Sequence, residues 1–215
     1  MTPKPRFAGS VLIVALIGFL LFVCGCNRSA IRVPGASLSF LETSTGYTSK
    51  TSYPHILVVS TPVDQRSQHY GERVAGTKWK GCSTDPFLGS DVSQIIQQRL
   101  LKELQASNLF SKVSTTPTSS EDVIMKTEIH AFCSQSVGFM IVRVAGISSL
   151  RVTLEQNGKV LLDRKFEKVV TDADKEYTGS QVTFLEQAMK VTMAVSLREL
   201  LKDMLKQIDE DAKSW

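Results

Sequence analysis

The chain has 215 residues, of which 25 are basic and 21 acidic, so its formal net charge is +4. The basic residues are interspersed with acids and form no basic block, which excludes the charge pattern of a nucleic-acid-binding protein. Without residues 1–25 the chain would keep 190 residues and a net charge of +2. That length is enough for one domain of ordinary size plus a tether.

The beginning of the chain has the pattern of a secretory signal. Lys4 and Arg6 precede thirteen residues, 11–23, that are all apolar or Gly. These are the charged and apolar regions of an exported protein's leader. The apolar run is well short of the roughly 20 residues that a membrane-spanning helix needs. The sequence therefore predicts a signal peptide over residues 1–25 that is removed from the mature protein.

The signal ends in Val23-Cys24-Gly25-Cys26, which resembles the lipobox of bacterial lipoproteins. Cys24 fits less well, because Val23 would stand where the peptidase needs a small residue. The resemblance implies cleavage before Cys26, acylation of that cysteine and a stable lipid anchor in the membrane. It also implies the periplasmic face of the outer membrane, since Asn27 replaces the Asp that retains lipoproteins in the inner membrane. An ordinary N-terminal helix with two buried thiols is the alternative.

The next segment, residues 26–53, is rich in Ser, Thr and Gly and keeps no period of 2 or 3.6. This composition predicts a flexible tether, part of which could pack as an edge strand around 37–41. The folded domain is expected over 54–215. It opens with a β-branched run at 55–63 that is bounded by prolines and predicts a strand.

A long polar stretch, 64–89, follows this strand and has the length of a functional loop. Asp64 and Arg66 could contact a partner or a ligand with a carboxylate or phosphate, or form a local turn bridged by an Asp–Arg contact. An exposed apolar patch around Trp79 would indicate a protein partner. The segment 71–78 approaches a phosphate-binding loop, but its Lys and Thr are reversed and no helix follows it directly, so we expect no nucleotide.

Two amphipathic helices are expected. The first begins at 90–91, where Asp91 and Gln94 have capping-box spacing, and ends at Asn108, which suits a left-handed terminal residue. The second runs over 183–208 with a Met-rich apolar stripe. That stripe either packs against a sheet or forms an adaptable groove for a partner or lipid.

The segments between the helices alternate as strands do. The strands are expected at 110–114, 122–133, 136–144 and 147–155. A three-residue turn around Gly158 would place Leu154 opposite Val160 and Arg151 opposite Asp163. The element order predicts an α+β fold with a mostly antiparallel sheet of four to five strands packed by two helices.

Cys82 and Cys133 are the two cysteines that follow the expected anchor. The periplasm is oxidising, so the pair can form a disulfide, which would contribute on the order of 4 kcal/mol by closing a loop of about fifty residues. Alternatively, Cys133 is a buried free thiol, because the alternation of its strand places it on one face with Val123 and Ile129. The three histidines have no spacing typical of zinc ligands, and we expect no metal or other cofactor.

No motif for nucleophilic catalysis is present, so we expect no enzyme. The layout resembles the ABC-type transport auxiliary lipoproteins and the YajG-type lipoproteins. It consists of the lipobox, a strand ending in Pro62-Val63-Asp64-Gln65-Arg66, a helix ending over 104–113, a turn at Asn157-Gly158 and a long final helix. The resemblance implies an α/β sandwich like that of the N-terminal domain of TolB.

Only Cys26 carries over from these families as a functional residue, and the segment 76–86 departs from them. The resemblance implies a non-catalytic accessory component of envelope transport or assembly, with an envelope protein as its partner. The alternative is a carrier of lipids or other amphiphiles that uses the last helix or the long loop.

Overall fold

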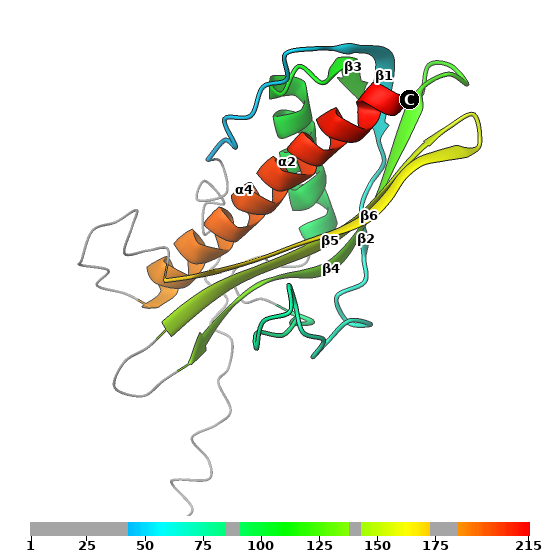
Figure 1. Cartoon of the computed structure of the whole chain (residues 1–215). Helices are drawn as coiled ribbons and strands as arrows, with labels where there is room; N and C mark the ends of the chain where they lie inside the picture. The colour runs from blue at the N-terminus through cyan, green and yellow to red at the C-terminus, as the bar shows by residue number, and fades with distance from the viewer. Residues whose placement is uncertain (1–42, 85–90, 138–142, 173–184) are drawn as a thin grey trace, which may run out of the picture. The chain divides into compact units, whose positions relative to one another are not determined.

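The computed structural model describes residues 43–84, 91–137, 143–172 and 185–215 (Figure 1). The predicted signal peptide and Cys26 lie outside these residues, as do the predicted edge strand at 37–41 and the predicted start of the last helix at Thr183. No helix in the described ranges is long and apolar enough to cross a membrane.

The described strands form one mixed sheet in the order β3-β1-β4-β5-β6, with β2 beside β4. Their bounds are β1 Tyr53–Val59, β2 Val63–Asp64, β3 Phe110–Ser114, β4 Val123–Val137, β5 Arg143–Gln156 and β6 Lys159–Thr171. Strands β4, β5 and β6 are antiparallel, whereas β1 lies parallel to β3 and β4, and β2 lies parallel to β4.

The predicted α+β class is confirmed, but the sheet has six strands and is mixed. A helix connects β1 to β3 and brings the chain back to the same end of the sheet, which makes the two strands parallel. The strand predicted at 136–144 is divided between two elements: 136–137 end β4 and 143–144 begin β5, while 138–142 lie outside the described residues.

Two helices, α2 Val92–Ala106 and α4 Leu185–Asp211, lie on the same side of the sheet, and a short 3-10 helix, Ala212–Ser214, follows α4 (Figure 1). Asp91 caps α2 by accepting a 2.9 Å hydrogen bond from the backbone N–H of Gln94. Asn108 follows α2 in the left-handed conformation, with φ of 56°. The predicted start and end of the first helix are both confirmed.

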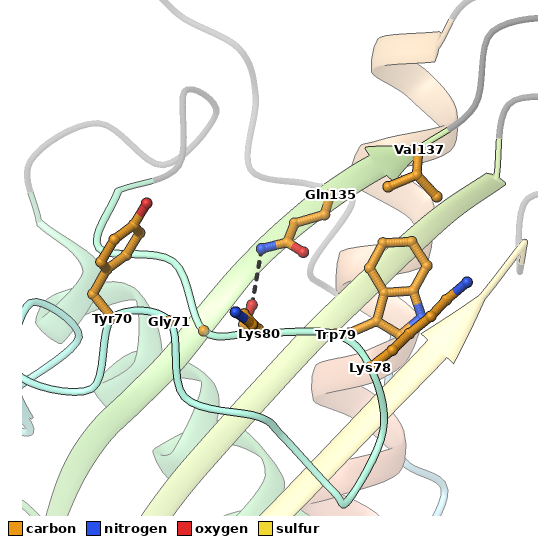
Figure 2. Close-up of a pocket in the computed structure, with 8 residues that line it drawn as sticks. Tyr70, Gly71, Lys78, Trp79, Lys80, Gln135 and Val137 are labelled. Atoms are coloured by element: carbon orange, nitrogen blue, oxygen red, sulfur yellow. Dashed lines mark hydrogen bonds between the residues drawn. The ribbon is translucent and has the colours of Figure 1, made fainter.

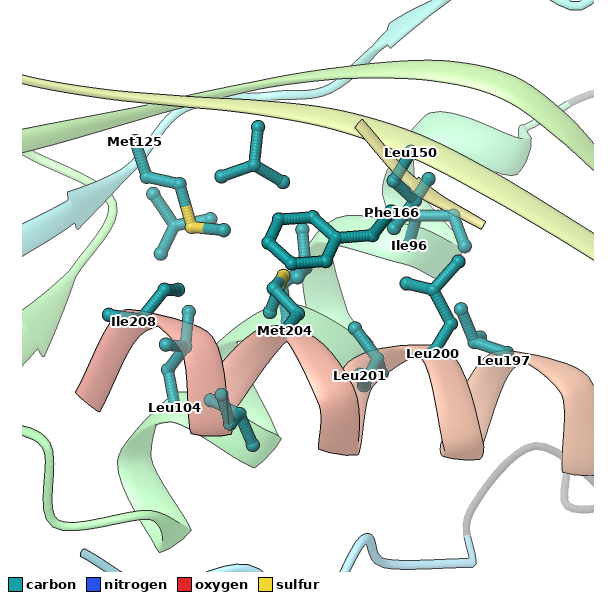
Figure 3. Packing of buried hydrophobic residues seen from close by; sticks show 14 of the residues in the cluster. Ile96, Leu104, Met125, Leu150, Phe166, Leu197, Leu200, Leu201, Met204 and Ile208 are labelled. Atoms are coloured by element: carbon teal, nitrogen blue, oxygen red, sulfur yellow. The ribbon is translucent and has the colours of Figure 1, made fainter. Parts of the chain in front are cut away.

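The main core lies between the helices and the sheet. Figure 3 shows Met125 and Leu150 of the sheet facing Leu200 and Met204 of α4, and all four side chains are buried. Met193 of the same helix is fully buried as well. The Met-rich stripe therefore packs against the sheet, and the packing interpretation is confirmed for this part of α4.

The helix α4 approaches β5 most closely at small residues. A Cβ on Gly146 would lie 2.0 Å from the backbone oxygen of Thr192, so only glycine fits at this point of contact. Two residues along β5, the hydroxyl of Ser196 lies 3.0 Å from that of Ser148 and 3.0 Å from the carbonyl oxygen of Lys168. These hydrogen bonds satisfy polar groups that the close packing buries.

The register predicted for the β5–β6 hairpin is wrong. Asn157 and Gly158 form a two-residue turn, both with positive φ, and Glu155 pairs with Val160, which leaves the Val160 side chain 53% exposed. A bulge then realigns the strands, so that Leu154 pairs with Leu162. Two-residue turns of this kind match the twist of antiparallel strands, and Asn-Gly favours them because both residues tolerate positive φ. The prediction of a three-residue turn gave too little weight to this preference.

The last part of the predicted tether belongs to the folded domain. Thr45 is buried, and both its backbone N–H and its hydroxyl donate to Oε2 of Glu103 in α2. The hydroxyl of Tyr47 donates to Asp209 of α4 at 2.5 Å. Burial, together with this hydrogen bond to Asp209, raises the pKa of Tyr47 to about 12. Residues 43–52 therefore belong to the folded domain and not to the tether expected over 26–53. They are held there because polar residues of this segment donate hydrogen bonds to Glu103 and Asp209.

Candidate functional site

The candidate site is built on a bulge in β4. Ile129 pairs with Leu150 and Ala131 pairs with Ser149, which leaves His130 without a partner in the register. One extra residue reverses the alternation of side chains along the strand. The prediction that Cys133 lies on one face with Val123 and Ile129 is therefore wrong, because the alternation changes after Ile129.

Beyond the bulge, apolar side chains of β4 and β5 point away from the helices and form a second core cluster. Its buried members are Val74, Trp79, Ala131, Cys133, Ala145 and Ile147. Two of them, Val74 and Trp79, come from residues 65–84, which we call the covering segment. This segment lies on the side of β4 away from α4 (Figure 1), and Trp79 is only 7% exposed.

The covering segment is an ordered hairpin-like loop. Its two halves are joined by hydrogen bonds from Gly71 N–H to the carbonyl of Gly81 (3.0 Å), and from Val74 N–H to the carbonyl of Trp79 (3.0 Å). Arg73 and Lys80 also form an isolated β-bridge. Part of the long polar stretch predicted as a loop therefore has regular backbone pairing, while 85–90 lie outside the described residues.

A disulfide joins Cys82 of the covering segment to Cys133 of β4, with 51 residues of sequence separation. The amide of Gln135 donates to the Cys82 sulfur at 3.2 Å and to the carbonyl oxygen of Lys80 at 2.8 Å. Because of the bulge, the Cys133 side chain points to the side of the sheet that the covering segment occupies, and the disulfide forms there. The covering segment is therefore held to β4 by a covalent bond in addition to these two hydrogen bonds.

Asp64 and Arg66, predicted as a ligand contact or a local turn, form the turn at the start of the covering segment. The Arg66 guanidinium donates to both Asp64 carboxylate oxygens, with shortest distances of 2.9 Å, and to the carbonyl of Phe132 at 3.3 Å. Burial alone would raise the pKa of Asp64, but the hydrogen bonds and charge of Arg66 hold it below its usual value. The buried Arg66 side chain thus connects the covering segment to β4.

Two histidines stack where the covering segment crosses the bulge. The rings of His69 and His130 are 3.7 Å apart at 16°, and each lies beside a carboxylate: His69 by Glu72 (3.0 Å) and His130 by Glu128 (3.1 Å). Burial lowers the pKa of His130, the nearby charges of His69 and Lys165 lower it further, and the hydrogen bond to Glu128 opposes them. Sequence reasoning missed this pair, since the two residues are far apart in the chain.

No group of three or more His, Cys, Asp or Glu side chains in the described ranges is arranged to hold a metal ion. The rings of the His69–His130 pair stack face to face, and one ring nitrogen of each is directed at a separate carboxylate. Its role in the fold is therefore to pack the covering segment on β4.

A surface pocket of about 380 Å³ lies between the covering segment and the end of β4 (Figure 2). The side chains that line it are Tyr70, Lys78, Trp79, Lys80, Gln135 and Val137. Tyr70 is 69% exposed and Val137 45% exposed, although both are large apolar residues. The Lys78 amino group lies 5.6 Å from the centre of the Trp79 ring.

The pocket combines apolar surface with positive charge. Its described lining residues include two lysines and no acid. Trp79, the aromatic residue that the sequence singled out, is itself nearly buried, and Figure 2 shows Val137 near it and Tyr70 at the opposite end of the pocket. Sequence reasoning missed Tyr70 and Val137, because nothing in a polar loop or at a strand end signals that these two residues line one pocket.

No family model matches the chain, and no curated protein matches it. The chain is similar to the crystal structure of protein XCC0632 from Xanthomonas campestris, family-model DUF330. The two are 13% identical, the match covers 78% of this chain and 93% of that chain, and the TM-score is 0.51. At this identity the similarity bears on the fold alone.

Two further solved structures match with lower TM-scores, too low to support an argument. Hypothetical protein CT253 from Chlamydia trachomatis is 11% identical, over 73% of this chain and 96% of that chain, with a TM-score of 0.41. An uncharacterized protein is 12% identical, over 75% of this chain and 97% of that chain, with a TM-score of 0.44.

Proposed function

We propose that this chain is an envelope lipoprotein, acylated on Cys26 and held at the periplasmic face of the outer membrane, that acts as a non-catalytic accessory component of envelope transport or assembly. In this proposal it binds a partner protein at the pocket between the covering segment and β4. The observation that carries the proposal is that Tyr70 and Val137, two large apolar side chains, are exposed at one pocket that two lysines also line.

The main core has its apolar side chains buried against one another, so the helix-facing side of the sheet offers a packed interior. The pocket on the opposite side has a different character. Large apolar side chains that stay exposed beside a nearly buried Trp are typical of surfaces that a partner covers. Among the described residues, five large hydrophobics are exposed, and two of these, Tyr70 and Val137, line this one pocket.

The docking of residues 43–52 bounds the distance between the proposed anchor and the domain. Seventeen residue steps separate Cys26 from Thr43, and a fully extended chain of that length spans at most roughly 60 Å. The domain would therefore work close to the membrane, where a membrane-bound partner of a transport or assembly system is within reach.

A carrier of lipids or other amphiphiles is the second candidate, since about 380 Å³ lies within the size range of small-molecule sites. Such sites bury most of the ligand surface, however. Exposed Tyr70 and Val137 at the pocket rim favour a partner that covers them from outside.

Photocrosslinking in cells tests the partner-binding proposal. A photoreactive amino acid would replace Tyr70 or Val137 in the full chain, with Val160 as the matched control. Val160 is an exposed apolar residue at the other end of the sheet. The β5 partners of Val137 and Val160, Arg143 and Glu155, are twelve residues apart, which is roughly 40 Å along a strand.

We expect the same discrete protein adduct from both pocket positions and none from Val160. The same adducts at all three positions, or none at any, would contradict the proposal. An adduct with radiolabelled phospholipid in place of protein would favour the carrier.

A separate experiment tests the anchor. Replacement of Cys26 by Ala should abolish incorporation of labelled fatty acid and release the chain from the membrane fraction, because the acyl chains supply the anchoring energy. Replacement of Cys24 by Ala is the matched control and should leave both unchanged. Labelling that persists without Cys26 would contradict the proposed lipidation site.

A further inference from the structure

We infer that the pocket recognises a short acidic segment of the partner protein, with a carboxylate near Lys78 and Lys80 and an aromatic or aliphatic side chain against Tyr70 and Val137. This inference rests on the proposed function, because it specifies the chemistry of the partner at the same site.

The two lysines are placed by the local backbone of the covering segment. Residues 78–80 lie in the second half of the hairpin-like loop, where Trp79 and Lys80 take part in its backbone pairing. Trp79 is buried in the second core cluster, whereas its sequence neighbours Lys78 and Lys80 are both exposed. Both lysines line the same pocket, with the Lys78 side chain beside the Trp79 ring (Figure 2).

Neither lysine forms an ion pair with a described residue. Lys78 instead lies over the Trp79 ring, at 5.6 Å from its centre. Some lysines of the sheet do pair with acids, as Lys126 does with Glu155 at 2.6 Å. With no acid among the described lining residues, the pocket is complementary to an anion.

The remaining groups of the pocket suit a peptide. The amide nitrogen of Gln135 donates hydrogen bonds to the carbonyl oxygen of Lys80 and to the Cys82 sulfur of the disulfide. Figure 2 shows its amide oxygen on the side of Trp79, where it can accept a hydrogen bond from a peptide N–H. Tyr70 and Val137 stand at the two ends of the pocket and supply apolar surface.

The pocket is also held in shape before anything binds. The disulfide, the Gln135 contacts and the stacked histidines all fix the covering segment on β4. A preformed site loses less conformational entropy when a ligand binds, so more of the contact free energy contributes to affinity. Its volume of about 380 Å³ holds a few side chains, and its exposed rim would leave a long acyl chain largely in water.

Peptide selection on the full lipidated chain in nanodiscs of neutral lipid tests the inference. A phage-displayed library of random peptides of about twelve residues is the probe. The test variant is Lys78→Glu with Lys80→Glu. The matched control is Lys112→Glu with Lys159→Glu, which makes the same charge change at exposed lysines that do not line the pocket.

We expect the wild type and the control to enrich peptides with Asp or Glu close to an aromatic or aliphatic residue. The pocket variant should bind these peptides roughly tenfold more weakly or worse, and wild-type binding should weaken as salt is added. An unchanged circular dichroism spectrum and an intact Cys82–Cys133 disulfide would show that the pocket variant is folded.

Failure to enrich any peptide, enrichment without an excess of acids, or equal binding by the pocket variant would overturn the inference. Protein adducts at Tyr70 and Val137 would then leave the proposed function standing with a partner of other chemistry. Binding to phosphatidylglycerol vesicles that the Lys78→Glu, Lys80→Glu change abolishes, without peptide binding, would also overturn it, because the anion would then be a lipid headgroup.

Discussion

The disulfide between Cys82 and Cys133 offers a direct test of how the covering segment is held. Replacing both cysteines with Ala removes a cross-link between residues 51 apart. In the chain-entropy model, a closed loop of this length contributes about 4 kcal/mol at 25 °C. Whole domains are stable by only roughly 5–15 kcal/mol, so the double variant should lose a large part of its free energy of unfolding.

Urea unfolding followed by far-UV circular dichroism measures this loss, and reduction of the wild type should reproduce it. A local readout separates the covering segment from the main core. In a Trp215→Phe background, fluorescence reports Trp79 alone, since the chain has two Trp residues. We expect Trp79 to become accessible to acrylamide when the cysteines are replaced, well below the urea concentration that unfolds the helices.

A loss of under about 1 kcal/mol, together with a Trp79 that stays protected from acrylamide, would refute this reasoning. It would mean that the hydrogen bonds and apolar contacts of the covering segment hold it without the covalent link. Loss of helical signal in step with Trp79 exposure would instead show that the two core clusters unfold as one cooperative unit.

Three other changes test packing, electrostatics and the docking of the N-terminal segment. Gly146→Ala should lower the free energy of unfolding by about 1–3 kcal/mol or more in urea titrations, because its Cβ would lie 2.0 Å from a Thr192 backbone atom. A loss below about 0.5 kcal/mol, which is the size of an ordinary surface substitution, would contradict this. Since burial in the folded protein holds the pKa of His130 below its ordinary value of 6.5, the unfolded chain takes up the proton first as the pH falls. The stability that a neutral His130 provides is therefore complete above about pH 6.5 and is lost progressively below it. The midpoint of thermal unfolding should depend less on pH below 6.5 in His130→Gln than in the wild type. An unchanged pH dependence would contradict this prediction. Thr45→Val removes a hydroxyl donor to the buried Glu103 carboxylate, which should cost about 1–3 kcal/mol and speed proteolysis within residues 43–52; equal cleavage rates would show that other contacts hold the segment.

The limits of α2 could be predicted because their signals are local. Asp91 and Gln94 are three residues apart, and Asn108 needs only its own left-handed backbone. The parallel strands could not be predicted in the same way. Whether β1 pairs with β3 and β4 depends on how the chain crosses the sheet through α2, and no short pattern in 53–59 records that crossing.

The site was predictable only in part, for a related reason. Cys82 and Cys133 could be considered as a pair because cysteines are rare in this chain, and Trp79 could be noticed as an aromatic residue in a polar stretch. The stacking of His69 on His130 depends on a bulge and on a loop folding back across it. Such contacts between distant parts of the chain leave no spacing that a sequence pattern can detect.

The unpaired residue at His130 explains why the sheet buries apolar side chains on its second face as well. Without the bulge, Ala131 and Cys133 would continue on the helix side, where α4 already fills the space. The bulge turns them to the other side, and buried apolar residues there need a cover, which Val74 and Trp79 provide.

The cover in turn creates the pocket. The disulfide fixes the covering segment, and with it Trp79, against Cys133. Lys78, Lys80 and Tyr70 belong to the same segment, so they are held beside the end of β4 together with Trp79. A deletion of His130 that restored regular alternation should therefore release the disulfide, the covering segment and the pocket together, while the packing of α4 on residues 123–129 of β4 stays intact.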